Sequence, residues 1–348
     1  MGRVSLKALY IEITSKCNLR CKHCYNESGN SNNEIDINAL FRLFEQVASM
    51  GVDGISISGG EPFMSANFLP IIRELKKYPQ FTVNIITNGT LFDEKTINDI
   101  LQILPNPIFQ ISLDGIGEQH DLIRGKGTFK KVNDAISLLK SCGCGFYFHA
   151  LIHRYNYKNI DEFIDYSRNI GVHKIDFAFL KRKGRGKCNY ESLALTCSEQ
   201  IELMKYMNAK KEIISTNGFQ VSFPTIFYGI CPIFSEKFST DIFARVDVNG
   251  NVFACQNFDG NCNSLGNILE EDISKIITEE RFKKQKEHFT KVPDNFNCES
   301  CFLSSFCGKG CPGVEYSDFE DLQLSSDCDI RREYARALLL GLKSKDSI

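Results

Sequence analysis

The chain has 348 residues, a length that accommodates one large domain and a smaller one. Its 41 Lys and Arg residues nearly balance 43 Asp and Glu residues, so the formal net charge of −2 gives no basic field for nucleic acid or an anionic membrane. Because no run of 18 apolar residues and no signal segment occurs, we expect a cytoplasmic protein with neither nucleic-acid nor membrane partners. In a reducing compartment, 15 cysteines favour metal ligation over disulfides.

Short β-rich runs alternate with helical patterns over the first 180 residues. The runs indicate buried strands, and the patterns between them indicate helices. The predicted strands are 8–14, 54–60, 82–89, 108–115, 146–153 and 174–180, and the predicted helices are 37–50, 67–77, 93–104, 129–141 and 159–170. Asp93 and Asn159 are predicted N-caps, and Gly51 and Gly171 follow two helices as terminating glycines do. This repeat predicts an α/β fold with parallel strands, either an open doubly wound sheet or an incomplete barrel.

The character of the chain changes after the sixth predicted strand. A basic, glycine-rich segment, 181–187, is interpreted as a solvated connection, and a helical pattern follows at 198–215. Short β segments come next at 220–227 and 242–257, the second with an Asn-Gly hairpin turn. Helices are predicted at 270–288 and 329–343, on either side of a cysteine-dense stretch, 298–313. We therefore expect two domains, 1–215 and 216–348.

Three cysteines, Cys17, Cys21 and Cys24, lie directly after the first predicted strand. Three thiolates in one tight loop can ligate three corners of a cubane iron-sulfur cluster and leave the fourth iron open. The alternative is a zinc site. Zinc requires a fourth ligand, and His23, adjacent to Cys24, is badly placed to point at the same metal.

The CxxxCxxC spacing at the end of the first strand resembles the signature of the radical S-adenosylmethionine (radical SAM) superfamily. The segment SGGEP at 58–62 resembles the GGE motif of that family, in which backbone and carboxylate groups hold the methionine ammonium. The resemblance implies a partial (β/α)6 TIM-like barrel and a 4Fe-4S cluster that binds S-adenosyl-L-methionine on its open iron and generates a 5′-deoxyadenosyl radical from it. The cofactor contacts that it implies are His23, Gly59, Gly60, Glu61, Ser112, Arg124 and Leu180.

Within this set the resemblance gives Ser112 the ribose, Arg124 the methionine carboxylate, and His23 and Leu180 the adenine. Plainer interpretations stay open: an exposed turn residue for Ser112, a surface side chain for Arg124 and a core residue for Leu180. Asp114 is interpreted as a turn former. Gly59 and Gly60 are expected to let the backbone approach the ligand because they lack Cβ atoms.

Seven cysteines in the second half of the chain resemble the SPASM domain, a Cys-rich α+β extension of radical SAM enzymes that holds twin auxiliary clusters. The resemblance implies three 4Fe-4S clusters in all. It assigns to one auxiliary cluster Cys298, Cys301, Cys307 and Cys328, and to the other Cys231, Cys255 and Cys311. The second set is one ligand short, and either Cys262 or substrate would complete it. Two zinc ribbons are the alternative. No role is assigned to Cys142, Cys144, Cys188 and Cys197, which are interpreted as buried thiols.

The resemblance leaves three substrate classes open: a ribosomally made peptide that gains a crosslink or an epimerised residue, a sulfatase that gains formylglycine, and a tetrapyrrole that is oxidised. Sulfatase maturases carry an Asp where this chain has Gln256, although Asp259 lies close, so peptide modification is preferred. An electron donor such as flavodoxin or ferredoxin is implied.

No separate leader-binding domain is expected before Ala8, so a peptide leader would dock on the barrel or SPASM surface or be presented by a partner protein. A non-enzymatic iron-sulfur carrier or a zinc scaffold is the remaining alternative. It would keep the cysteines but has no use for the GGE motif, Ser112 or Arg124.

Overall fold

The computed structural model describes residues 5–214, 218–224, 241–260, 263–290, 298–307 and 327–345. The strands of these segments form one sheet in the order β10-β9-β8-β1-β2-β3-β4-β5-β6-β7. From β8 across β1 to β7 every neighbouring pair is parallel, whereas β8, β9 and β10 pair antiparallel. The strands are β1 (Ser5–Glu12), β2 (Gly54–Ser58), β3 (Thr82–Thr87), β4 (Ile108–Ser112), β5 (Gly145–Ile152), β6 (Lys174–Phe179), β7 (Gln220–Ser222), β8 (Asp241–Val246), β9 (Asn251–Phe253) and β10 (Gly266–Asn267).

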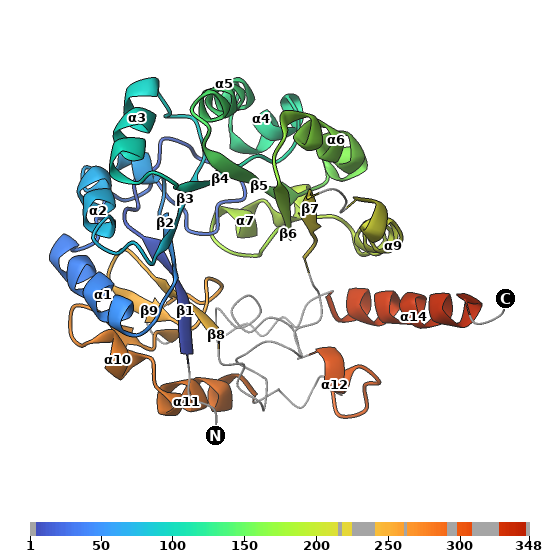
Figure 1. Ribbon diagram of the computed structural model, residues 1–348. Helices are drawn as coiled ribbons and strands as arrows, with labels where there is room; N and C mark the ends of the chain where they lie inside the picture. The colour runs from blue at the N-terminus through green and yellow to red at the C-terminus, as the bar shows by residue number, and fades with distance from the viewer. Residues whose placement is uncertain are drawn as a thin grey trace.

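The helices that connect consecutive parallel strands lie on the outer side of the curved sheet, as Figure 1 shows. Among the described strands this is the incomplete barrel, since their sheet has two free edges, β10 and β7, and does not close. The helices of the barrel part are α1 (Ile37–Ser49), α2 (Phe68–Leu75), α3 (Glu94–Ile103), α4 (Glu118–Arg124), α5 (Thr128–Ser141), α6 (Ile160–Ile170), α7 (Arg185–Cys188), α8 (Tyr190–Leu193) and α9 (Cys197–Ile214). Those that follow are α10 (Ile273–Ile276), α11 (Glu279–Thr290), α12 (Ser304–Cys307) and α14 (Asp327–Lys345).

Alternation along the strands separates an apolar core from a polar interior. In β2, Ile55 and Ile57 are fully buried in the core that also holds the apolar face of α1. Ser56 and Ser58, one residue out of phase, line the cavity inside the barrel instead. Because successive side chains of a strand point to opposite faces, the outer face can pack against helices while the inner face stays free for a ligand.

Most of the predicted elements are confirmed, with ends shifted by a few residues. Asp93 caps α3, since its Oδ1 accepts a hydrogen bond of 2.7 Å from the amide of Thr96. Asn159 makes no capping bond, because the 3-10 turn 157–159 leads directly into α6. The single helix predicted at 270–288 is two helices, α10 and α11, because the helical conformation ends at Ile277. The side chain of Thr278 then accepts a hydrogen bond from the amide of Arg281 at the start of α11.

The hairpin predicted at 242–257 is confirmed: β8 and β9 pair antiparallel around Asn249 and Gly250. In addition, β8 pairs parallel with β1, so the sheet continues beyond the predicted domain boundary near residue 215. A buried ion pair accompanies this pairing, with Arg245 Nη2 and Nε each 3.0 Å from an oxygen of Glu12. The boundary itself remains a prediction.

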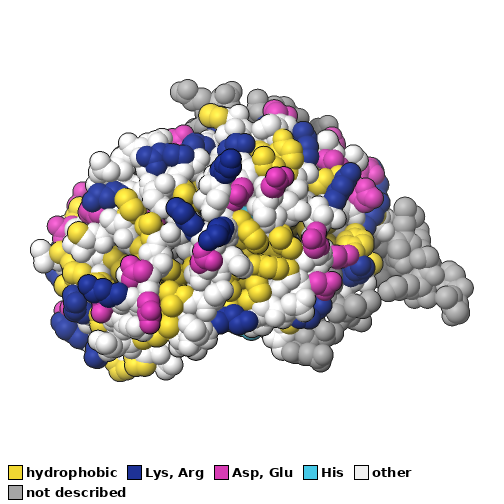
Figure 2. Space-filling view, turned by 90° about the horizontal axis from the view of Figure 1, so that it is seen from above, with side chains coloured by type: hydrophobic (Ala, Val, Ile, Leu, Met, Phe, Trp, Pro, Cys, Tyr) yellow, Lys and Arg dark blue, Asp and Glu magenta, His cyan; other side chains and the backbone are white. Residues whose placement is uncertain are grey.

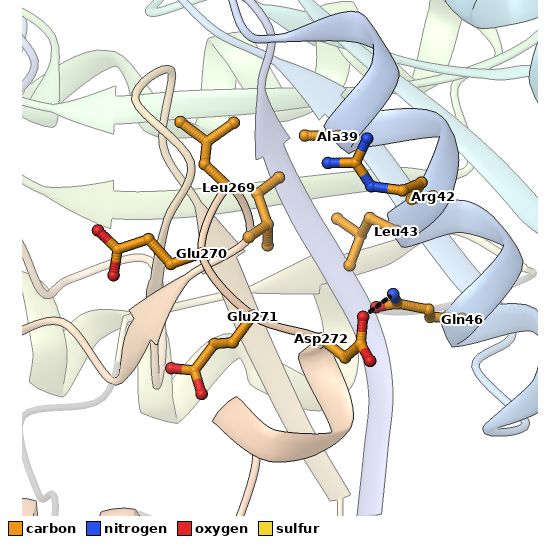
Figure 3. A pocket seen from close by; sticks show the side chains of 9 residues that line it. Ala39, Arg42, Leu43, Gln46, Leu269, Glu270, Glu271 and Asp272 are labelled. Carbon is orange, nitrogen blue, oxygen red and sulfur yellow. Dashed lines mark hydrogen bonds between the residues drawn. The ribbon is translucent and has the colours of Figure 1, made fainter.

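Helix α1 also contacts the segment that follows β10. Gln46 donates to Asp272 Oδ1 at 2.6 Å, as Figure 3 shows. It also accepts from the amide of Ile273 at 3.0 Å. A pocket of about 140 Å³ lies between α1 and residues 268–272, and none of the predicted site residues lines it. This contact fixes the second half of the chain to the outside of the barrel.

The described surface has mixed charge. On the face seen in Figure 2, Lys and Arg side chains are interspersed with Asp and Glu, and apolar side chains gather in small areas between them. Within the described residues, no helix is both long and apolar enough to cross a membrane.

Candidate active site

A cavity of about 800 Å³ fills the inside of the barrel and reaches the loops at the carboxyl ends of its strands. This is the edge at which parallel α/β folds bind their ligands. Eight of the residues predicted from the first two motifs and from the fourth strand line it: Cys17, Cys21, Cys24, His23, Gly59, Gly60, Ser112 and Arg124. Glu61 and Leu180 are not among the lining residues. Cys255, from the second half of the chain, is.

The three thiols are presented by a loop that its own backbone holds. The Cys17 sulfur accepts a hydrogen bond of 3.4 Å from the amide of Leu19, and the amide of Cys24 donates to the carbonyl of Cys21 at 3.3 Å. Cys21 is 8% exposed, and burial raises the pKa of its thiol to about 11. A bound metal centre would provide the positive charge that these buried thiols need in order to ionise.

The GGE motif packs against the start of this loop. Gly60 donates a 2.6 Å hydrogen bond to the carbonyl of Thr14, and a Cβ on Gly60 would lie 2.2 Å from the carbonyl oxygen of Lys16. A Cβ on Gly59 would lie 2.5 Å from the Thr14 oxygen. The glycines line the cavity as expected, but the first requirement for them is the close approach of two backbones.

Glu61 braces the loops behind the cavity. Its side chain is fully buried, and it accepts hydrogen bonds from Thr87 Oγ1 at 2.7 Å and from the amide of Asn88 at 2.8 Å. Asn88 in turn donates to the side chain of Asn18, inside the cysteine loop, at 3.0 Å. Burial raises the pKa of Glu61 to about 7. The carboxylate therefore connects the ends of β2 and β3 to the loop that carries the thiols.

Arg124 forms a buried ion pair rather than a surface contact. It comes from α4, which the sequence analysis did not predict, and its Nε lies 2.6 Å from Asp114 Oδ2. Burial would raise the pKa of Asp114, but the Arg124 charge outweighs it and holds that pKa below its ordinary value. The other carboxylate oxygen accepts from the amide of Leu151 at 2.8 Å. Asp114, interpreted as a turn former, is the residue that orients Arg124.

The remaining predicted contacts lie in different surroundings. Ser112 ends β4 and lines the cavity, beside His149 of β5. Burial, together with the charge of Arg124, lowers the pKa of His23 to about 3, so its ring is neutral. Leu180 is 8% exposed and packs in an apolar cluster with Leu151, outside the cavity lining. Its surroundings are those of the core interpretation.

The segment 181–187 is not a solvated connection. Lys183 is only 5% exposed, and Arg185 begins α7 with its guanidinium bonded to the carbonyls of Cys21 and Ser28. A run of basic residues is usually a solvated surface, so its composition gives no sign of this burial. The two glycines within the run were the available signal, since they permit close backbone packing.

Four cysteines of the second half meet around one small cavity. It has a volume of about 40 Å³, and the thiols that line it are those of one predicted auxiliary cluster: Cys298, Cys301, Cys307 and Cys328. Cys328 comes from the start of α14, which packs against α9 through Ile330 and Tyr334. Of the other predicted set, Cys255 lines the barrel cavity, whereas Cys231 and Cys311, like the spare Cys262, lie outside the described residues.

The unassigned thiols lie away from the barrel cavity. Cys142 and Cys144 pack against the main core, and Cys197 packs beside α14. Cys188 is exposed on α7, so its interpretation as a buried thiol is wrong. None of the four is among the residues that line the cavity.

The residues after Cys255 bear on the choice of substrate class. Gln256 lines the cavity. It occupies the position at which, by the resemblance, sulfatase maturases carry an Asp. Asp259 is outside the lining, and its Oδ2 lies 2.9 Å from Lys183 Nζ. The geometry therefore does not support Asp259 as a replacement for the Asp of sulfatase maturases.

The donor set fits iron-sulfur clusters better than single ions. In the part of the chain that the structure describes, no three side chains of His, Cys, Asp or Glu converge closely enough to hold one metal ion. A cubane cluster does not require such convergence, because each thiolate binds a different iron. Three thiols facing one cavity and four facing another match the ligand numbers of a cluster with an open iron and of a closed one.

The fold and this thiol-lined cavity define a radical SAM protein. Residues 11–167 match the model of the radical SAM superfamily, and residues 238–302 match the SPASM model, an iron-sulfur cluster-binding domain. The chain belongs to this superfamily and is an enzyme of that class. The two matches imply S-adenosylmethionine and iron-sulfur clusters as its cofactors.

Curated relatives agree with this membership. The chain is 25% identical to a mycofactocin maturase of Mycobacterium tuberculosis over 312 residues, which are 88% of this chain and 78% of that protein. It is 28% identical to a PqqA peptide cyclase of Granulibacter bethesdensis over 56% of this chain and 52% of that one. It is also 26% identical to an Fe-coproporphyrin III synthase of Methanosarcina barkeri, over 77% and 72% of the two chains.

Solved structures share the fold. The protein anSMEcpe, with bound AdoMet and a Cp18Cys peptide, superposes with a TM-score of 0.72 at 21% identity, over 98% of this chain and 100% of that chain. SuiB of Streptococcus suis, bound to its precursor peptide SuiA, superposes with a TM-score of 0.71 at 17% identity, over 91% and 74% of the two chains.

Proposed function

We propose that this enzyme uses S-adenosylmethionine to abstract a hydrogen atom from a ribosomally made peptide, which then gains a thioether or carbon-carbon crosslink or an epimerised residue. The observation that carries the proposal is the cavity of about 800 Å³ in which Cys17, Cys21 and Cys24 face Arg124, with Cys255 in the same lining. Support for a peptide comes from the relatives and structural neighbours whose names include a peptide substrate.

In this proposal Cys17, Cys21 and Cys24 would hold the first cluster, and S-adenosylmethionine would bind beside it in the cavity. When bound, the cluster supplies the electron that cleaves S-adenosylmethionine to the radical that attacks the substrate. Arg124, oriented by Asp114, would bind the methionine carboxylate. Residues 1–215 would form the radical SAM core domain and 216–348 the SPASM domain with its C-terminal helix.

The other chain groups surround this centre. His23, Gly59, Gly60 and Ser112 would contact S-adenosylmethionine, with Glu61 bracing the loop and Leu180 packing behind it. We assign two auxiliary clusters to the second set of thiols: Cys231, Cys255, Cys298, Cys301, Cys307, Cys311 and Cys328. Together with the first cluster, the chain would hold three 4Fe-4S clusters. Flavodoxin or ferredoxin would donate the electron, and a leader-binding partner protein would present the peptide.

The test is anaerobic reconstitution of the full chain with iron and sulfide. We expect about 12 irons per chain, since each of three clusters holds four. Incubation with S-adenosylmethionine, dithionite and a candidate peptide encoded beside the gene should release 5′-deoxyadenosine and change the peptide mass. Cys17→Ala should abolish both products, whereas Cys188→Ala, at an exposed thiol outside the cavity, should retain them. Zinc in place of iron, or no 5′-deoxyadenosine from loaded protein, would exclude the proposal.

A second candidate is oxidation of a tetrapyrrole side chain, favoured by the similarity to an Fe-coproporphyrin III synthase. The same incubation with an iron tetrapyrrole that carries additional side-chain groups, in place of the peptide, distinguishes the two. Formation of Fe-coproporphyrin III, with no change in any peptide, would select this candidate.

A further inference from the structure

The segment 181–187 binds the loop that carries the first three thiols. The amide of Arg185 donates to the carbonyl of Cys24 at 2.9 Å, and its Nε donates to the carbonyl of Cys21 at 2.9 Å. Both terminal nitrogens of the same guanidinium lie 3.2 Å from the carbonyl of Ser28. One side chain thus connects two points of the loop, on either side of Cys24.

The approach of the two backbones is closer than a side chain would allow. Gly184 has a φ of +51°, and a Cβ there would lie 2.5 Å from the carbonyl oxygen of Tyr25 and 2.6 Å from that of Cys24. Glycine is therefore required both for the backbone conformation and for the space. The segment is fitted against this loop along its backbone as well as through Arg185.

The same segment binds the loop after Cys255. Lys183 Nζ donates to the carbonyl of Asn257 at 2.6 Å and lies 2.9 Å from Asp259 Oδ2. The amide of Asn257 in turn donates to the sulfur of Cys255 at 3.4 Å. The ammonium group is buried and paired, the arrangement in which breaking a charged contact has its largest effect.

We propose that residues 181–187 are a positioning element that fixes the Cys255 loop relative to the loop of Cys17, Cys21 and Cys24. The two loops are far apart in sequence and line one cavity, and Lys183 and Arg185 hold one each. Their acceptors are backbone carbonyls, apart from one carboxylate. Cys255 and the three thiols of the first loop would then keep a constant separation across the space that substrate enters. The inference rests on the proposed use of both loops as cluster sites.

The test compares Lys183→Met and Arg185→Met with Arg182→Met, a residue of the same segment whose guanidinium pairs with Glu191 and lies over the ring of Tyr190, both in α8. Amide hydrogen exchange is measured by mass spectrometry on the full chain, reduced and free of iron. We expect Lys183→Met to accelerate exchange at 255–260 by about tenfold and to accelerate it measurably at 21–28, because both loops lose a shared support. Arg185→Met should accelerate exchange more strongly at 21–28 than at 255–260. Arg182→Met should change exchange in neither loop.

Effects confined to the loop that each residue touches would overturn the proposal, since they would mean two independent contacts. Lys183→Gln, which keeps a hydrogen-bond donor, tests the same point if Lys183→Met does not fold, and should show a smaller change of the same pattern. In the reconstituted chain, Lys183→Met should shift the electron paramagnetic resonance signal of an auxiliary cluster, and an unchanged signal would also count against the proposal. If the natural chain failed to load clusters, that result would contradict the proposed function. The exchange result, which is measured on iron-free protein, would still decide the present proposal.

Discussion

The site depends on polar side chains that are buried and are held by hydrogen bonds and ion pairs. Asp114 is the clearest case, because its two oxygens bind Arg124 and the amide of Leu151 and its side chain has no exposure to solvent. Such a carboxylate holds a cation in one orientation. It also makes the site sensitive to the loss of a single charge.

We expect Asp114→Asn to lower the free energy of unfolding by about 3–5 kcal/mol, because it leaves the buried Arg124 guanidinium without its counter-charge. Urea unfolding of the reduced, iron-free chain measures this. The control is Asp165→Asn, which removes an exposed partner of Arg168 and should cost about 0–1 kcal/mol. Equal effects of the two substitutions would contradict the prediction.

Glu61 predicts a pH dependence. Burial raises its pKa from 4.5 to about 7, against the opposing effect of its hydrogen bonds, so the folded protein holds this proton more tightly than the unfolded chain does. The stability that it contributes is therefore fully present below about pH 4.5 and is lost as the pH rises to about 7.

The variant Glu61→Gln has no proton to lose at this position. The free energy of unfolding of the natural chain, minus that of the variant, should fall by about 2–4 kcal/mol between pH 4 and pH 8. Urea unfolding at several pH values measures this difference. Parallel pH profiles for the two proteins would show that the pKa of Glu61 is not raised.

At this scale the sequence indicates which residue types matter but not which of them touch. The positions of Cys17, Cys21, Cys24 and Arg124 in the cavity lining agree with the motifs that singled them out. The pairing of Asp114 with Arg124 depends on α4, a short helix without a clear periodic pattern, and could not be predicted. The burial of a single polar side chain depends on packing between distant segments, which one sequence does not display.

At the scale of elements, the loops that follow β1 and β2 are held by their backbones. Gly60 lies against residues 14–16, which lead into the first cysteine. The thiol loop is therefore placed by the neighbouring loop before any ligand is bound.

Gly60→Ala should lower the free energy of unfolding by about 1–3 kcal/mol, because the added Cβ would lie 2.2 Å from the Lys16 oxygen and the backbone must move. Gly145→Ala is the matched control, since a Cβ there has no neighbour within 4 Å, and it should be neutral or stabilising by up to about 1 kcal/mol. Thermal and urea unfolding of both variants decide the question. A loss for Gly145→Ala as large as that for Gly60→Ala would contradict this account.

Long elements were predictable and short ones were not. The six strands and the longer helices of the barrel follow from periodicity, since each buries one apolar face. Helix α7 has four residues, and it exists because Arg185 and its neighbours bind the cysteine loop. A tertiary contact of this kind overrides what the local composition indicates.

For the whole molecule, the sheet joins both halves of the chain. β8 comes from the second half and lies between β1 and β9, with the buried pair of Glu12 and Arg245 across the junction. The βα repeat and the motifs predicted the fold class and the division of the cysteines into sets of cluster ligands. The pairing of β8 with β1 could not be predicted, because neither strand carries a local signal for a partner so distant in sequence.

We expect β1 and β8 to unfold together. In the iron-free chain, the amides of 5–12 and 241–246 should exchange with the same opening free energy, since removing β8 would expose the edge of β1 and an unpaired buried charge. Native-state hydrogen exchange at increasing denaturant measures both. Opening of 241–246 at clearly lower free energy would show that the second half unfolds separately.

The place of β1 in the sheet also governs the order of events during synthesis. β1 leaves the ribosome before β2 and β8, and β2 can pair with one of its edges early. Its other edge finds its partner only after residue 246 has been made. Throughout that interval the nascent barrel carries an open strand edge of the kind that recruits other chains. A strand from the second half of the chain therefore protects a strand from the first half from aggregation.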